Sequence, residues 1–219
     1  MCFSATADTA AGLLVTAIGA DALRRAHGPG DRALGSIPVV LGAHLLVEAV
    51  VWHGLTGTVA ASTGRLAMWI YLGIAVVVLP VLVPLAVRAV EPDARRRQAM
   101  ARLGVSGAGL AAIYLFGLLD GPVDVRIEGR HMAYQLGMSH GGLLAAVYTI
   151  VTCAPLLLSS ERRIVAFGLA NLLAVAVLTW LQSSALTSLW CAWAAVTSVA
   201  IATHLRRQQT APEVRTHAA

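Results

Sequence analysis

Residues 37–57 read IPVVLGAHLLVEAVVWHGLTG, an apolar run that carries one carboxylic acid, Glu48, near its middle. A helix of about 20 residues spans the roughly 30 Å hydrocarbon core of a bilayer, so this stretch is long enough to cross a membrane. A charged side chain at that depth costs on the order of 3 kcal/mol on insertion scales, and such residues mark functional sites. His44, Glu48 and Trp52 recur at every fourth position, which places them on one face of the predicted helix. We therefore predict that the function is organised around Glu48.

The composition of the whole chain points to a membrane protein. Of its 219 residues, 58% are hydrophobic and only 12% are charged, and the mean hydropathy is +0.74. These values exclude an ordinary soluble domain and predict an all-α integral membrane bundle. The net charge of +5 is carried by arginines without a single lysine. Because these arginines fall in predicted loops, we attribute them to membrane orientation rather than to nucleic-acid binding.

Apolar segments predict seven transmembrane helices in one domain over residues 1–205, followed by a polar, disordered cytoplasmic tail over residues 206–219. The segments lie at about 9–23, 37–57, 66–87, 103–119, 131–157, 164–182 and 184–204.

Arginines are distributed unevenly between alternate predicted loops. One set of loops, together with the tail, holds Arg24, Arg25, Arg32, Arg88, Arg95, Arg96, Arg97, Arg102, Arg162, Arg163, Arg206, Arg207 and Arg215. The other set holds only Arg65, Arg126 and Arg130. Cytoplasmic loops carry the excess of Arg and Lys, so the N-terminus is predicted outside and the C-terminus in the cytoplasm. We expect a multi-pass protein of the cell membrane.

With this orientation, the polar residues of the predicted helices gather in the outer half of the membrane. We expect an outward-leaning cavity with Glu48 at its floor and as its catalytic acid. The other predicted catalytic residues, as relay or base, are Asp120, His140 and Cys191. The predicted substrate-binding residues are His44, Trp52, His53, Tyr114, His131, Tyr134, Trp180, Trp190 and Trp193.

Several cofactor chemistries lack their residues in this chain. A retinal Schiff base needs a lysine, diphosphate binding through Mg²⁺ uses paired aspartates, and zinc hydrolases carry motifs such as HExxH; none is present. We therefore expect no cofactor. The expected partners are a lipophilic small molecule and membrane lipid, without nucleic acid. Two alternatives stay open. One is a metal- or small-ligand-binding membrane protein, sensor or transporter, using Cys2, Glu48, His53, His131, His140 and Cys191. The other is a purely structural membrane subunit, in which neutralising Glu48 would change stability alone.

Four short motifs resemble a family of small polytopic membrane proteins that begin MCFSATAS. They are MCFSATA at 1–7, EAVVW at 48–52, PLLLSS at 155–160 and SLWCA at 188–192. The chain departs from the family pattern at Asp8, where serine is usual, and at His44, where glutamine is expected. Most members have no assigned function, so this resemblance implies an architecture rather than a reaction.

The predicted helix count, the length and the buried acid also resemble, more loosely, the membrane-bound terpene cyclases of meroterpenoid pathways. Bacterial members of drimentine type cyclise a farnesyl chain attached to an indole diketopiperazine, so the resemblance implies a similar substrate. A neutral carboxylic acid can protonate an alkene. Aromatic faces can stabilise the resulting carbocations, by up to about 2 kcal/mol each in a dry site. We therefore predict a cyclase initiated by protonation from Glu48 and completed by deprotonation.

Overall fold

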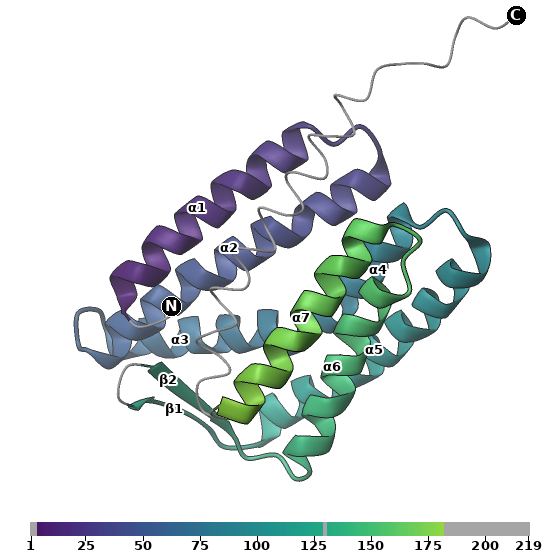
Figure 1. Cartoon of the computed structure of the whole chain (residues 1–219). Coiled ribbons are helices and arrows are strands. Elements are labelled where there is room, and N and C mark those ends of the chain that lie inside the picture. The colour runs from purple at the N-terminus through teal and green to yellow at the C-terminus, as the bar shows by residue number, and fades with distance from the viewer. Residues whose placement is uncertain (1–3, 129–130, 182–219) are drawn as a thin grey trace, which may run out of the picture.

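The computed structural model describes residues 4–128 and 131–181. Its elements are α1 (Ala5–Arg24), α2 (Pro29–Leu55), α3 (Ala61–Leu72), the π-helical η1 (Gly73–Val78), α4 (Leu79–Val90), α5 (Ala94–Asp120), β1 (Val123–Glu128), β2 (His131–Leu136), α6 (Gly141–Leu157) and α7 (Arg162–Leu181). Because α3, η1 and α4 continue as one 30-residue rod, the described residues form six helices and one hairpin (Figure 1).

The fold is mostly helical, as predicted, but the described chain has six helices rather than seven. The seventh predicted segment, 184–204, and the predicted tail, 206–219, lie outside the described residues. Three helices are long and apolar enough to cross a membrane: Pro29–Leu55, Ala61–Val90 and Ala94–Asp120. They indicate a multi-pass membrane protein.

The prediction of one helix over residues 131–157 is wrong in its first part. Residues His131–Leu136 form β2, which pairs antiparallel with β1, and the helix begins only at Gly141. In a strand, alternate residues point to the same face, so Met132 and Tyr134 can both be buried there. In a helix, residues two apart would point to different sides. Gly137 and the Gly141–Gly142 pair flank the break, and His140 between them adopts a left-handed backbone with φ 64°.

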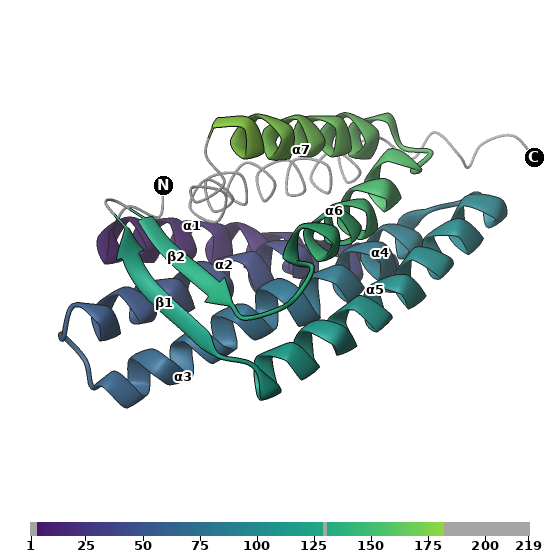
Figure 2. The ribbon, with the colours of Figure 1, turned by 90° about the horizontal axis from the view of Figure 1, so that it is seen from below.

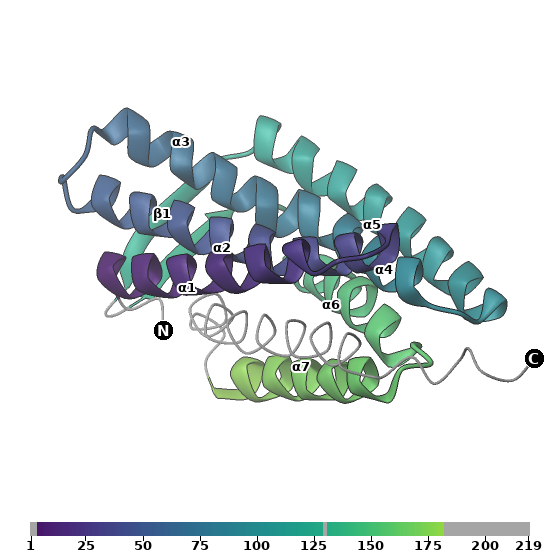
Figure 3. The same cartoon turned by 90° about the horizontal axis from the view of Figure 1, so that it is seen from above.

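Helix α2 occupies the middle of the bundle. It lies between α1 and α3, as the view from above shows (Figure 3), and it also packs on α4. Its contact with α1 is close because glycines face the partner helix: a Cβ added at Gly19 would lie only 2.7 Å from the backbone nitrogen of Val39. A side chain on the inner faces of α2 is therefore enclosed by helices on several sides.

The long rod α3–η1–α4 has an irregular turn in which one backbone carbonyl bonds to a side chain of α6. In the π-helical turn, the amide of Leu79 donates to the carbonyl of Ile74, five residues earlier. The next residue, Pro80, has no amide hydrogen, so the carbonyl of Ala75 has no backbone donor in the rod. The Tyr148 hydroxyl of α6 donates to that carbonyl at 2.8 Å. This bond ties α6 to the rod at the irregular turn.

The two ends of the bundle differ in charge. The α1–α2, α4–α5 and α6–α7 turns lie at one end, and the α2–α3 turn and the hairpin lie at the other (Figure 1). The first end carries Arg24, Arg25, Arg32, Arg88, Arg95, Arg96, Arg97, Arg162 and Arg163. The described part of the second end carries Arg65 and Arg126. The alternate loops grouped by arginine content in the sequence are thus also grouped in space.

Candidate functional site

The predicted polar face of α2 is buried. The exposed fraction is 3% for His44, 1% for Glu48 and 7% for Trp52. Residues four positions apart stack along one helical face, and α2 is enclosed by α1, α3 and α4. Glu48 therefore lies inside the protein, with an imidazole and an indole one turn away on either side.

Three aromatic rings from three separate elements form a stack beside this face. His44 of α2 lies on Tyr71 of α3 with ring centroids 4.0 Å apart and planes at 14°. Tyr71 in turn lies on Tyr134 of β2, with centroids 4.6 Å apart and planes at 15°. Both faces of the Tyr71 ring are thus occupied. The stack joins the middle of α2 to the hairpin.

Two rings of the stack, Tyr71 and Tyr134, belong to a larger packed group of residues from the helices and the hairpin, which we call the aromatic cluster. Its buried members are Val51, Trp52, Ala67, Met68, Tyr71, Leu72, Leu118 and Met132, and Trp69, Val123, Val125 and Tyr134 pack against them. Figure 2 shows the two strands lying across the bundle at this end. The alternation of β1 and β2 turns one face of the hairpin toward α2 and α3.

Two buried polar atoms of this region have no hydrogen-bond partner among the residues that the structure describes. They are Nδ1 of His44 and Nε1 of Trp52. Almost all buried polar groups in proteins are hydrogen-bonded, so an exception needs an explanation. Both atoms belong to side chains one turn from Glu48. Near Glu48 there are thus two polar atoms that could contact a ligand.

A second buried acid, Asp8, lies at about the same level of the bundle as Glu48. It was not predicted as a site residue. Its exposed fraction is 1%. Antiparallel contacts of Gly12 with Leu46 and of Gly19 with Val39 set the register of α1 and α2. One turn further, this register places Asp8 level with residues 49–50, within a helical turn of Glu48.

The signal that could have identified Asp8 is the cap of α1. Ser4 accepts a hydrogen bond from the amide of Ala7 at 3.2 Å, so the helix begins at Ala5. The sequence interpretation placed the helix start at residue 9. It thereby left Asp8 outside the helix, although a serine before an apolar run is a known start signal.

The other predicted site residues are dispersed. Tyr134 belongs to the stack, His53 is half-buried beside Trp52, and Tyr114 is half-buried one turn before Leu118 of the aromatic cluster. Asp120 is exposed at the end of α5. Of these residues, Tyr134 is the one that the described ring stack includes.

His140 does not occupy its predicted position. It was expected inside the fifth membrane helix, but it is exposed at the residue before α6 begins, because the strand and the glycine-rich turn displace the helix start. Cys2, Cys191, Trp190 and Trp193 lie outside the described residues. His131 opens β2 and Trp180 lies in α7, but their side chains also fall outside the described part.

The alternative of a metal site gains nothing from the geometry. Across residues 4–128 and 131–181, no group of three or more His, Cys, Asp or Glu side chains could hold a metal ion. The residues that such a site would need in addition, Cys2 and Cys191, are not among those described.

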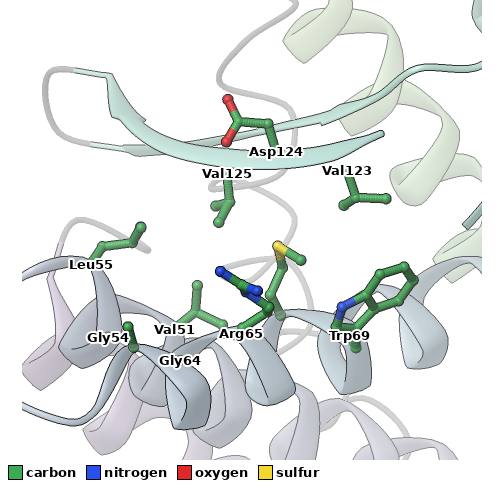
Figure 4. Close-up of a pocket in the computed structure, with 11 residues that line it drawn as sticks. Val51, Gly54, Leu55, Gly64, Arg65, Trp69, Val123, Asp124 and Val125 are labelled. Atoms are coloured by element: carbon green, nitrogen blue, oxygen red, sulfur yellow. The ribbon is translucent and has the colours of Figure 1, made fainter. Parts of the chain in front are cut away.

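A cavity of about 390 Å³ adjoins the aromatic cluster at the hairpin end of the bundle (Figure 4). It lies between the last turns of α2, the first turns of α3 and strand β1. Its lining residues are Val51, Gly54, Leu55, Ala61, Gly64, Arg65, Met68, Trp69, Val123, Asp124 and Val125.

A third buried carboxylate, Glu91, lies at the opposite, arginine-rich end. Its exposed fraction is 4%. It accepts hydrogen bonds from the amide of Ser160 at 2.7 Å, from the Ser159 hydroxyl at 3.3 Å, from the amide of Asp93 at 3.1 Å and from the Ser160 hydroxyl. Arg96 donates to the carbonyls of Leu158 and Ser159, both at 3.0 Å. These bonds join the α4–α5 turn to the α6–α7 turn.

The hydrogen bonds decide the ionisation of Glu91. Burial by itself would raise the pKa of this carboxyl. The donors from Ser160, Asp93 and Ser159 outweigh that effect and hold the pKa below its ordinary value of 4.5. Glu91 is therefore an ionised structural acceptor.

Comparison with known proteins places the chain in a family without assigning it an activity. No curated protein and no solved structure matches the chain. The comparisons therefore provide no support for the resemblance to terpene cyclases. One family model, described as "Family of unknown function (DUF6629)", matches residues 1–216, which is nearly the whole chain. The protein therefore belongs to the DUF6629 family of unknown function.

Proposed function

We propose that this protein is a membrane-embedded terpene cyclase, with Glu48 as the general acid. The substrate would be a prenylated small molecule, such as a farnesylated indole diketopiperazine. One observation carries the proposal: Glu48 is buried in the middle of an apolar helix, on one face with His44 and Trp52, beside a stack of aromatic rings. An acid held in such surroundings suits proton donation to an apolar substrate.

The reaction requires one proton to enter and one to leave. The Glu48 carboxyl donates its proton to one carbon of a terminal alkene, and the other carbon becomes a tertiary carbocation. A second alkene attacks the cation and closes the ring. Loss of a proton from a neighbouring carbon then forms a new alkene, so the product has the mass of the substrate. Asp8 lies in the same layer as Glu48, and we assign it, rather than Asp120 or His140, as the candidate base.

Aromatic faces would stabilise the cation, and the stack limits which rings are available. Tyr71 has His44 on one face and Tyr134 on the other, so its own faces cannot meet a substrate. Trp52, Trp69 and the outer face of Tyr134 remain as candidates. A cation over such a ring gains up to about 2 kcal/mol in a dry site.

The proposal includes an orientation in the cell membrane. The arginine-rich end would face the cytoplasm, because cytoplasmic loops carry the excess of Arg and Lys. The hairpin end, with the cavity and the aromatic cluster, would face outward, and the N-terminus would lie outside. The separation of arginines between the two ends of the bundle supports this orientation.

The test is incubation of the purified full chain, in lipid nanodiscs, with linear farnesylated indole substrates, followed by chromatography with mass spectrometry. We expect a new peak of unchanged mass and altered retention. The Glu48→Gln variant should lower its rate of formation by about 10²–10⁴-fold, the usual contribution of a general acid.

Glu91→Gln is the matched control, because it neutralises another buried carboxyl far from the ring stack. It should form the product at the wild-type rate per folded protein. No product across a panel of prenylated indoles would overturn the cyclase assignment. Product formation by Glu48→Gln at the wild-type rate would remove Glu48 from the mechanism.

A further inference from the structure

The cavity beneath the hairpin has a floor formed by closely packed helices. The backbones of α2 and α3 touch where they border it: a Cβ added at Gly64 would lie 2.7 Å from the Cα of Gly54. The cavity volume of about 390 Å³ lies within the range of small-molecule binding sites.

Apolar side chains line the cavity from both the helices and the strand. Val51, Leu55 and Met68 line it from the helices, and Val123 and Val125 line it from the strand. Figure 4 shows both valines pointing toward α3, whereas the Asp124 carboxylate points away on the other face of β1. These apolar side chains can cover an alkyl chain from both sides.

Arg65 supplies the charge of the cavity. It rises from the second turn of α3 into the space under β1 (Figure 4). Within the part of the chain that the structure describes, Arg65 forms no ion pair. Arg126 of β1, by contrast, does form an ion pair: its Nε lies 2.7 Å from the Glu128 carboxylate. The guanidinium of Arg65 is thus available to a ligand.

We propose that this cavity binds a single-chain anionic amphiphile. The headgroup, a phosphate or a carboxylate, contacts the Arg65 guanidinium, whose fork of donors matches both groups. The alkyl chain lies against the valines of β1 and the apolar residues of α2 and α3. The half-buried indole of Trp69, beside Arg65, has the amphipathic character that suits this boundary. The proposal is independent of the cyclase assignment, since it uses neither Glu48 nor Asp8.

The test uses the full chain in phosphatidylcholine nanodiscs and three probes with the same chain length: decyl phosphate, decanoate and decanol. Isothermal titration, with empty nanodiscs as the blank, measures saturable binding. We expect at least one anionic probe to bind at one site per chain, at least about tenfold more tightly than decanol. Tighter binding of decyl phosphate would identify a phosphorylated ligand, and tighter binding of decanoate would identify a fatty acid.

Two variants locate the site. Arg65→Gln should weaken the anionic probe by at least about tenfold, whereas Arg126→Gln, which removes a nearby arginine outside the cavity, should not change its affinity. Val125→Phe, which fills the cavity from β1, should weaken both charged and uncharged probes while the helical circular dichroism is kept. Equal affinity of the wild type and Arg65→Gln, equal losses in the two arginine variants, or no saturable binding would overturn the proposal.

Discussion

Glu48 and Glu91 are both almost fully buried, with exposed fractions of 1% and 4%, yet their surroundings differ. Glu91 follows the end of α4, in a turn, where free backbone amides and two serine hydroxyls converge on its carboxylate. Glu48 lies in the interior of α2, where the amides are already used by the helix. Its neighbours along the face are an imidazole and an indole.

The difference shows that burial by itself does not identify a functional acid. At Glu91, hydrogen bonds replace the hydration of the charged form, so the carboxylate acts as a fixed link between two turns. Glu48 lies instead in the middle of an apolar helix, beside the ring stack of His44, Tyr71 and Tyr134. We therefore propose a structural role for Glu91 and a chemical role for Glu48. Three expected results test this distinction, and a fourth tests the bond of Tyr148 to the rod.

The largest expected effect is on catalysis. Glu48→Gln should reduce cyclase turnover by about 10²–10⁴-fold, and Glu91→Gln should leave the turnover of the folded protein unchanged. The measurement is product formation per folded protein, with the folded fraction taken from size-exclusion chromatography. A similar loss of turnover in both variants would end the functional distinction between the two acids.

The second effect is on stability. Glu91→Gln leaves the donors of Ser159, Ser160 and Asp93 with fewer acceptors, so the free energy of unfolding should fall by about 1–3 kcal/mol. Thermal or denaturant unfolding in a neutral detergent measures it. The exposed Glu161→Gln, one residue beyond Ser160, is the matched control and should change stability much less. An unchanged stability in Glu91→Gln would show that the two turns do not depend on this carboxylate.

The third expectation concerns acid. Because the pKa of Glu91 is held below 4.5 in the folded protein, its contribution to stability is present above that pH. The contribution is lost as the pH falls through the lower, folded-state pKa. The unfolding temperature of the wild type should therefore decline below about pH 4.5 more steeply than that of Glu91→Gln. Parallel pH profiles for the two proteins would contradict this role.

The smallest effect is expected at the π-helical turn. Tyr148→Phe removes the only described donor to the Ala75 carbonyl and should lower stability by on the order of 1 kcal/mol, as interhelical hydrogen bonds in membranes do. Tyr114→Phe, a half-buried tyrosine of α5 without a described hydrogen bond, is the control. Equal unfolding temperatures for wild type and Tyr148→Phe would show that the carbonyl finds another partner.

Much of the site could be predicted from α2 alone. The spacing of His44, Glu48 and Trp52 predicted a shared face, and the structure confirms that this face is buried. Asp8 could not be predicted in the same way, because its burial depends on the register between α1 and α2. Nor could the hairpin, because the apolar residues after residue 130 suit either a helix or a strand until their pairing with β1 is known.

The sequence by itself determined the properties that act locally: the apolar stretches long enough to cross a membrane, the face that carries Glu48, and the arginines that distinguish alternate loops. These follow from helical periodicity and from the cost of placing charge in hydrocarbon. Only the tertiary structure decided the ring stack of His44, Tyr71 and Tyr134, the level of Asp8, the cavity beside Arg65, and the bond of Tyr148 to Ala75. Each of these joins segments far apart in the chain, and their relative positions depend on how the helices and the hairpin pack rather than on any one segment.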